Sequence, residues 1–252
     1  MNPDAYVQMA ETESRHWWFV ARRILLSSII SRMGLPLNIR ILEVGAGTGG
    51  NLEMLSRFGH VSAMEMDGTA RAIAKKKTRG CFDIRSGSCP SSIPFPEAAF
   101  DLICLFDVLE HIEEDVASLT ALKRLLTPQG RILLTVPAYQ WLWSEHDEFL
   151  HHKRRYLASD LRERIEGAGL QIEKLSYFNT LLFPLAVIAR AKDRLFNAAS
   201  ASGTSIPVAP INKFFYLVFS AERFLLRMFS LPFGVSLYAI VHPRRSPVSA
   251  DE

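Results

Sequence analysis

Cysteine is scarce in this sequence, with three residues in 252: Cys81, Cys89 and Cys104. They show neither CxxC spacing nor a companion histidine at zinc-ligand spacing, which argues against a disulfide framework and indicates no metal site. We therefore expect ordinary reduced cysteines and no bound metal.

The chain also lacks a strong net charge, since its formal value at pH 7 is only +3. The longest basic runs are residues 75–77 and 151–155, so a large nucleic-acid footprint is not expected. Residues 1–13 are polar and acidic and lack the basic start and apolar run of a signal peptide. These features favour a cytoplasmic protein.

Long hydrophobic runs are missing as well. Residues 181–189 are too short to span a membrane, and residues 214–241 are interrupted by three charged side chains. Their uncharged remainder, residues 228–241, falls short of the ~20 apolar residues that a spanning helix needs. A segment lying on the inner face of the membrane remains compatible with the sequence.

What the sequence does have is the composition of a globular protein, with 48% hydrophobic and 22% charged residues. Its length fits a single domain. Within residues 1–252 we expect four parts in chain order: a helical cap (1–36), a cofactor-binding core (37–178), a hydrophobic helical insertion (179–233) and a last strand (234–242).

Apolar runs that read as strands alternate with segments of helical periodicity, which indicates an α/β fold with a parallel, doubly wound sheet. The run at residues 100–106 is apolar apart from Asp101, as in strands buried on both faces. The predicted helices are residues 51–58, 68–78, 116–126 and 158–168, and the predicted strands are residues 39–44, 61–66, 82–85, 100–106, 131–136, 171–177 and 236–241.

A glycine-rich turn follows the first predicted strand. Gly45, Gly47 and Gly50 satisfy GxGxxG, and Glu65 stands twenty residues after Gly45, so a dinucleotide-binding fingerprint is formally matched. NAD and S-adenosylmethionine share the adenosine ribose that such a carboxylate binds. Glu43 favours the second cofactor, because a carboxylate there opposes a pyrophosphate but suits the ammonium of a methionine moiety.

Three motifs in order, ILEVGAGTG (41–49), AMEMD (63–67) and FDLICLFDVLEH (100–111), resemble those of class I S-adenosylmethionine-dependent methyltransferases. The resemblance implies a Rossmann-like methyltransferase fold with a mostly parallel seven-stranded sheet and an antiparallel last strand.

By the same resemblance, Glu43 and the glycine loop hold the methionine end of S-adenosylmethionine, Glu65 its ribose and residues 87–89 its adenine. Many family members carry aspartate where this chain has Ser88. The full set of implied cofactor residues is Glu43, Gly45, Ala46, Gly47, Gly49, Asn51, Glu65, Met66, Ser88, Cys89, Phe106 and Asp107.

Candidates for acceptor chemistry cluster in WLWSEHD (141–147) and HHKRRY (151–156). Histidine can accept a proton near neutral pH, so His152 and His146 are candidate general bases, with Asp147 as an orienting partner. His111 is a further candidate, although Glu110 and His111 could equally be solvated residues at the start of a helix.

Two further alternatives concern the arginines and the N-terminal aromatics. Arg154 and Arg155 either bind a phosphate or carboxylate of the acceptor or form salt bridges. The HWWF motif (16–19), together with HD and HKRRY, resembles a bacterial subgroup of the family whose acceptors are mostly undefined. Its aromatic residues either cover the ligands or pack on the core.

The insertion contains a segment, residues 214–228, that is apolar on both helical faces and must be buried, dimeric or in contact with lipid. Residues 198–203 are predicted to form a loop. Our hypothesis is that the insertion and the aromatic loop at residues 137–150 together form the pocket of an apolar or lipid-linked small acceptor.

The sequence therefore favours S-adenosylmethionine-dependent methyl transfer to a small acceptor, with oxygen as the expected target atom. Two alternatives remain open: an NAD-dependent oxidoreductase, which GxGxxG alone supports, and a non-catalytic adenosyl-binding protein that uses its hydrophobic insertion for assembly.

Overall fold

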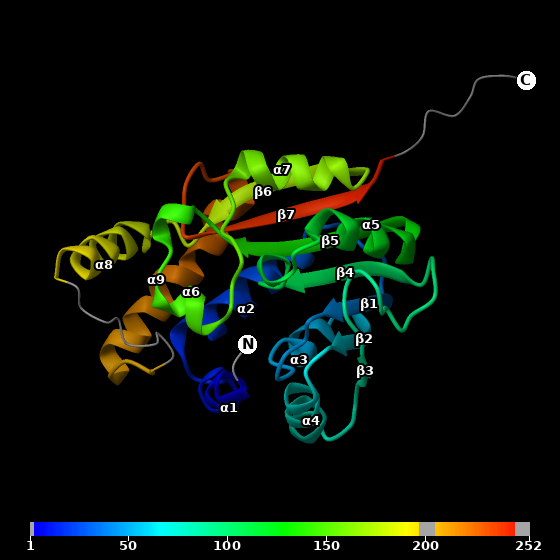
Figure 1. Ribbon diagram of the computed structural model, residues 1–252, viewed down its shortest axis with the longest axis horizontal. Helices are drawn as coiled ribbons and strands as arrows, with labels where there is room; N and C mark the ends of the chain where they lie inside the picture. The colour runs from blue at the N-terminus through cyan, green and yellow to red at the C-terminus, as the bar shows by residue number, and fades with distance from the viewer. Residues whose placement is uncertain (1–2, 197–204, 245–252) are drawn as a thin grey trace, which may run out of the picture.

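The computed structural model describes residues 3–196 and 205–244, which form one seven-stranded sheet flanked by helices on both faces (Figure 1). The strand order is β3-β2-β1-β4-β5-β7-β6. β1 to β5 are parallel, whereas β7 runs antiparallel to both β5 and β6. The predicted mostly parallel α/β sheet with a reversed last strand is confirmed. The strands are β1 (Ile39–Val44), β2 (Gly59–Glu65), β3 (Asp83–Ser86), β4 (Phe100–Phe106), β5 (Leu126–Pro137), β6 (Leu170–Phe178) and β7 (Ser236–Pro243).

The helices divide between the two faces of the sheet. Leucine and isoleucine side chains of α5 and α7 pack on one face, and those of α2, α3 and α9 pack on the other. The α-helices are α1 (Pro3–Thr12), α2 (Trp17–Ile30), α3 (Leu52–Leu55), α4 (Gly68–Lys77), α5 (Asp115–Leu125), α6 (Glu145–Phe149), α7 (Ala158–Gly167), α8 (Phe183–Phe196) and α9 (Ala209–Met228), with short 3-10 helices η1 (Leu109–His111) and η2 (Gln140–Leu142).

The central strand β1 shows how side-chain alternation directs the site. Leu42 and Val44 face the core under α5 and α7, while Ile39 and Ile41 face the core under α2. Because side chains alternate along a strand, Glu43 points to the same face as Ile41. The sequence therefore buries a carboxyl group under the N-terminal helices.

α2 packs on the face of the sheet to which Ile41 and Glu43 point. His16 caps its first turn, with a ring nitrogen that accepts a hydrogen bond from the Trp18 amide at 3.2 Å. Ala21, Leu25 and Leu26 pack into the core, and Arg22 on the same helix is buried too. The predicted N-terminal cap thus consists of two helices, and one of them carries a buried cation.

Some of the predicted elements have clearly different bounds. The helix predicted at residues 51–58 is only the single turn α3, and β2 begins at Gly59, two residues earlier than predicted. A side chain at Gly59 would meet the Ile39 carbonyl oxygen at 1.9 Å, so the close strand pairing requires glycine there. The fifth strand extends over Leu126–Pro137 rather than residues 131–136.

The predicted aromatic loop is also more regular than expected. It contains η2 and α6, and Ser144 and Asp147 form a reciprocal capping box at the start of α6. The capping box therefore holds the Asp147 side chain in place through contacts within α6 alone.

In the insertion, α9 packs against α2, while α8 lies at the edge of the molecule, away from the sheet (Figure 1). The predicted loop at residues 198–203 lies outside the described residues. Within the described part of the chain, no helix combines the length and the apolar character needed to cross a membrane.

Candidate functional site

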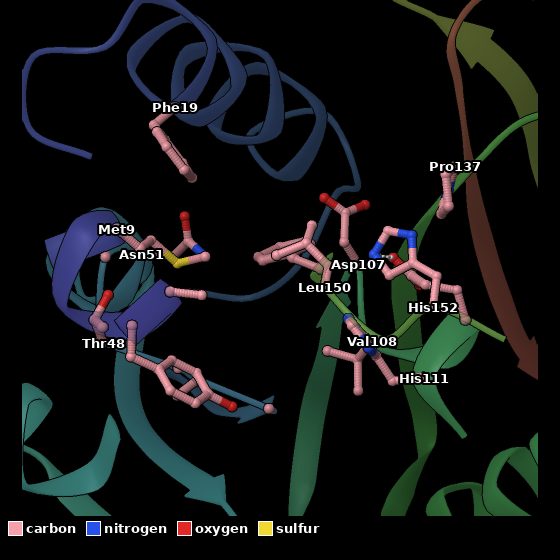
Figure 2. A pocket seen from close by; sticks show the side chains of 18 of the residues that line it. Met9, Phe19, Thr48, Asn51, Asp107, Val108, His111, Pro137, Leu150 and His152 are labelled. Atoms are coloured by element: carbon pink, nitrogen blue, oxygen red, sulfur yellow. Dashed lines mark ion pairs between the residues drawn. The ribbon is translucent and has the colours of Figure 1, made fainter. Parts of the chain in front are cut away.

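A cavity of about 850 Å³ lies where β1, β2, β4 and β5 end, between the sheet and the N-terminal helices. Ligands of open α/β sheets bind at this edge, and pockets for small molecules span roughly 300–1,000 Å³. Figure 2 shows Met9, Thr48 and Asn51 at one end of the cavity and His111 and His152 at the other. The two ends are built from different parts of the sequence.

The first end is the glycine turn after β1. Gly45 has a positive φ of 67°, and a side chain there would meet Val108 at 2.7 Å, so the turn requires glycine. The Gly47 amide donates to one carboxylate oxygen of Glu65 at 2.8 Å, and the Asp67 amide donates to the other at 2.9 Å. Glu65 thus ties the glycine turn to the end of β2.

Glu43 lies behind this end, fully buried. The Asn51 side-chain amide donates to one of its oxygens at 2.8 Å, and its other oxygen has no partner. Burial raises the pKa of Glu43 to about 8, even though Asn51 and Arg22 oppose the shift. The carboxyl group therefore carries a proton at pH 7 unless a cation approaches.

The structure places most of the predicted residues together. Neither Glu43 nor Gly49 lines the cavity, and Gly49 instead packs against Ala74 and Leu52. Asp147 is buried beneath the wall. The candidates that line the cavity are Gly45, Ala46, Gly47, Asn51, Glu65, Met66, Ser88, Cys89, Phe106, Asp107, His111, His146 and His152.

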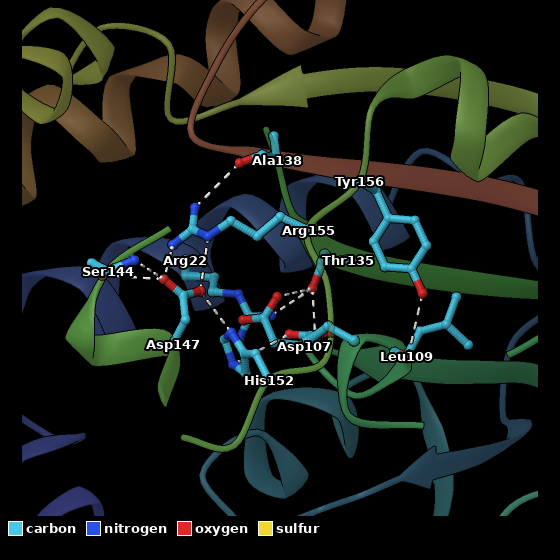
Figure 3. Close-up of polar contacts among 11 residues, drawn as sticks. Arg22, Asp107, Leu109, Thr135, Ala138, Ser144, Asp147, His152, Arg155 and Tyr156 are labelled. Atoms are coloured by element: carbon cyan, nitrogen blue, oxygen red, sulfur yellow. Dashed lines mark hydrogen bonds and ion pairs between the residues drawn. The ribbon is translucent and has the colours of Figure 1, made fainter. Parts of the chain in front are cut away.

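Asp107, at the end of β4, is held in a conformation with a positive φ of 57°. Such backbone strain in a non-glycine residue persists only where the surroundings enforce it. Thr135 donates to its side chain at 2.9 Å, and Arg22 forms an ion pair with it at 2.7 Å. Figure 3 shows Arg22, Thr135 and Asp107 in one group.

Two cavity residues were missed from the sequence. Arg22 contacts Asp107 and also lies over the Trp18 ring, 4.8 Å from its centroid. Glu13 is buried, accepts a hydrogen bond from Thr48 at 3.0 Å and pairs with Lys77. A charged residue on the apolar face of a predicted helix was the available signal for Arg22, but nothing local indicated Glu13.

The second end of the cavity is built around Asp147 and His152. A ring nitrogen of His152, Nδ1, lies 2.9 Å from Asp147 Oδ1. Arg155 donates to both Asp147 oxygens, at 2.8 and 3.0 Å, and the Ser144 amide donates at 2.9 Å (Figure 3). Burial would raise the pKa of Asp147, but the hydrogen bonds from His152 and Arg155 lower it overall. The carboxylate therefore stays ionised and fixes the His152 ring.

Glu110 and His111 follow β4 and complete this end. One alternative from the sequence was that both residues are solvated. For Glu110 this alternative is wrong, because its side chain is fully buried. Neither of its carboxyl oxygens has a hydrogen-bond partner. Burial, and secondly Asp107, raise the pKa of Glu110. The His111 and His152 rings lie 4.7 Å apart, and burial followed by His152 lowers the pKa of His111 to about 4.

The paired arginines take the structural role that the sequence left open. Arg154 forms ion pairs with Asp115 at 3.0 Å and Glu113 at 3.2 Å. Arg155 is bound to Asp147, as described above. Acceptor binding by either arginine is therefore not supported, because both guanidinium groups already hold carboxylates.

The insertion contributes less to the cavity than expected. α9 supplies no lining residue, and α8 supplies only Arg190, among the residues that the structure describes. The hypothesis that the insertion forms the acceptor pocket is corrected accordingly. α9 reaches the site indirectly, since the Asn212 side chain accepts a hydrogen bond from the Trp17 amide at 2.9 Å and Phe215 packs on the Trp17 ring.

Comparison with known sequences identifies relatives of this chain. The family described as "Methyltransferase domain" matches residues 18–175. A "Probable S-adenosylmethionine-dependent methyltransferase" of Mycolicibacterium smegmatis is 25% identical over 161 residues, which cover 63% of this chain and 61% of that protein. The "Ubiquinone/menaquinone biosynthesis C-methyltransferase UbiE" of Vibrio vulnificus is 24% identical over 172 residues, covering 56% and 66% of the two chains. The chain thus spans less than two thirds of the length of these relatives.

Among solved structures, phosphoethanolamine N-methyltransferase 2 of Haemonchus contortus, in complex with S-adenosyl-L-methionine, superposes with a TM-score of 0.58. It is 14% identical, and the alignment covers 88% of this chain and 52% of that one. At this identity the likeness supports the fold alone.

Proposed function

Since the chain belongs to the methyltransferase domain family, we propose that it transfers a methyl group from S-adenosylmethionine to a small acceptor, with oxygen as the target atom. The observation that carries the proposal is a single cavity that joins the glycine turn and Glu65 to the Glu110, His111 and His152 cluster. An NAD-dependent oxidoreductase is not supported, because only GxGxxG favoured it and the matching family is a methyltransferase domain.

In this proposal the glycine turn and Asn51 hold the methionine end of the cofactor, with the Glu43 carboxylate behind them opposite the ammonium. Glu65 accepts from the ribose hydroxyls, because each carboxylate oxygen keeps a second lone pair after binding one amide. Ser88 and Cys89 line the adenine end, and Phe106 and Asp107 form the floor. The positions of Asn51, Glu65 and Asp107 in the cavity wall support these roles, and Glu43 is buried next to Asn51.

At the acceptor end, His152 takes the proton of the acceptor hydroxyl while its oxygen attacks the methyl carbon and the carbon–sulfur bond breaks. The sulfonium becomes a neutral thioether, so positioning contributes much of the acceleration. Asp147 orients the ring through Nδ1, leaving Nε2 for the acceptor, and stabilises the imidazolium that forms. His146 lines the same cavity, and we assign it to acceptor contact.

The acceptor in this proposal is apolar or lipid-linked. α9 exposes an apolar stripe of side chains along one face, made of Phe214, Leu217, Phe224, Leu225 and Met228. Exposed apolar patches of this kind mark interaction surfaces. Lys213, Arg223 and Arg227 lie on the same helix, and its one acidic residue, Glu222, is buried against the Asn179 and Leu181 amides. This pattern matches a helix that lies on an anionic membrane surface.

Methyl transfer is tested with a panel of phenols that carry or lack a prenyl chain and with S-adenosylmethionine labelled in its methyl group. We expect a labelled product, and mass spectrometry of the product distinguishes an O-methyl from a C-methyl group. His152→Ala should lower turnover about 100-fold or more while cofactor affinity is unchanged.

His60→Ala is the matched control, because His60 is exposed at the amino end of β2, the edge opposite the cavity. Equal losses of turnover and cofactor affinity in His152→Ala would assign that histidine a structural role. A panel without any labelled product would count against methyl transfer to this acceptor class.

A further inference from the structure

Glu110, His111 and His152 form a compact group of metal-ligating side chains at the acceptor end of the cavity. One ligand atom from each, a carboxylate oxygen and two imidazole nitrogens, lies within 4.8 Å of the others. Glu110 and His111 follow β4, and His152 follows α6, so two separate segments converge here. The cysteine spacing in the sequence gave no indication of this group.

The Glu110 carboxyl group lacks any partner that would explain its burial. It is fully buried, both of its oxygens lack a hydrogen bond, and the closest cationic candidate, His152 Nε2, is 3.9 Å away. Burying an ionisable group without a partner is costly unless it is neutral or meets a cation. A bound cation would satisfy both oxygens.

His152 is already oriented as a metal-ligating histidine usually is. Such a histidine commonly donates its second ring nitrogen to a carboxylate or a backbone carbonyl, which fixes the ring and its tautomer. His152 contacts Asp147 through Nδ1 at 2.9 Å. Asp147 in turn accepts hydrogen bonds from Arg155 and from the Ser144 amide, which fix the carboxylate that orients His152.

We propose that Glu110, His111 and His152 bind one divalent transition-metal ion, Zn²⁺ by the donor set, with an open coordination position facing the cavity. Two imidazoles and one carboxylate make up the protein ligands of a known class of catalytic zinc sites, whereas Mg²⁺ prefers oxygen ligands alone. Ligand atoms around zinc lie about 3 to 3.5 Å apart, so the side chains turn inwards when the ion binds.

The catalytic role of the ion rests on the proposed function, whereas its binding does not. An acceptor hydroxyl bound at the open position becomes more acidic and loses its proton to solvent. Its oxygen then attacks the methyl carbon as the carbon–sulfur bond breaks and the thioether leaves. With the ion bound, His152 is a ligand, and the ion replaces it as the group that activates the acceptor.

The test is a calorimetric titration of chelator-treated protein with ZnCl₂ alone, in the absence of cofactor and acceptor. We expect one equivalent to bind. Glu110→Gln, His111→Ala and His152→Ala should each weaken binding at least about 100-fold, since even loss of an outer-shell partner costs 10- to 100-fold. Each variant is titrated separately, and its circular dichroism spectrum checks that it is folded. If one variant misfolds, the other two still test the inference.

Two matched controls address other zinc ligands: His60→Ala removes an exposed histidine, and Cys81→Ser removes an exposed cysteine. Both should bind zinc as the wild type does. Absence of stoichiometric binding, or binding that persists in the three cluster variants or disappears in a control, would overturn the inference. Titrating Glu110→Gln with S-adenosylhomocysteine keeps the two proposals separate, because cofactor binding should survive there whatever the zinc result.

Discussion

Glu43 is a buried carboxyl group whose charge should depend on the cofactor. Its pKa is raised to about 8 by burial, so in the free protein it is mostly protonated at pH 7. Opposite the ligand ammonium it must be ionised, so binding releases a proton. Affinity should therefore rise nearly tenfold per pH unit below about 8 and level off above that pH.

Calorimetry of S-adenosylhomocysteine binding at pH 7 checks this, because released protons make the heat depend on the ionisation enthalpy of the buffer. We expect close to one proton from the wild type and none from Glu43→Gln, which is neutral at every pH. Equal heats in phosphate and Tris for the wild type would mean that Glu43 does not ionise on binding.

Glu65 is the residue expected to hold the ribose. Glu65→Ala should weaken S-adenosylhomocysteine binding by about 1.5 to 3 kcal/mol, roughly tenfold to 150-fold, as charge-assisted hydrogen bonds are lost. Part of the loss arises because the Gly47 and Asp67 amides also lose their acceptor. Glu163→Ala, an exposed glutamate on α7, is the control, and unchanged affinity in Glu65→Ala would refute the assignment.

At the scale of elements, α9 exposes apolar side chains that no other described part of the chain covers. Its inner face, with Phe219 and Leu226, is buried against the core, while Leu217 and Met228 face solvent. We expect the protein to float with vesicles that contain anionic lipid and to do so less at high salt, because exposed charges are screened.

Leu217→Asp should weaken vesicle binding by about 2 kcal/mol, roughly 30-fold, since one leucine side chain is no longer buried in the bilayer. Leu37→Asp is the control, because Leu37 is equally an exposed leucine but lies before β1. A wild type that ignores vesicles and elutes as a dimer would assign the stripe to a second copy of the chain instead.

The elements that the sequence predicted well are those with local signals. The strands at residues 39–44 and 100–106 were found because mostly apolar runs stand next to glycine or an acidic residue. β2 was predicted to begin two residues too late, because the pairing of Gly59 with Ile39 is a contact between strands and has no signature in the local sequence.

Across the whole molecule, the cavity is assembled from residues that are distant in sequence. The glycine turn and Glu65 were predictable because their spacing is local, as was the pairing of Asp147 with His152 within one segment. Arg22 and Glu13 were not, because their roles depend on the packing of α1 and α2 over the ends of β1 and β4, and for Glu110 the sequence left a solvated position open. The fold brings buried charges together that periodicity alone treats as surface residues.

The central claim is that one cavity holds the cofactor at the glycine turn and the acceptor at Glu110, His111 and His152. A crystal structure with S-adenosylhomocysteine tests it most directly, because the sulfur marks where the methyl group leaves. The account predicts ribose hydroxyls on Glu65, adenine beside Ser88 and Cys89, and a sulfur that faces His152 across open cavity. A ligand bound elsewhere, or a sulfur directed away from that cluster, would contradict it.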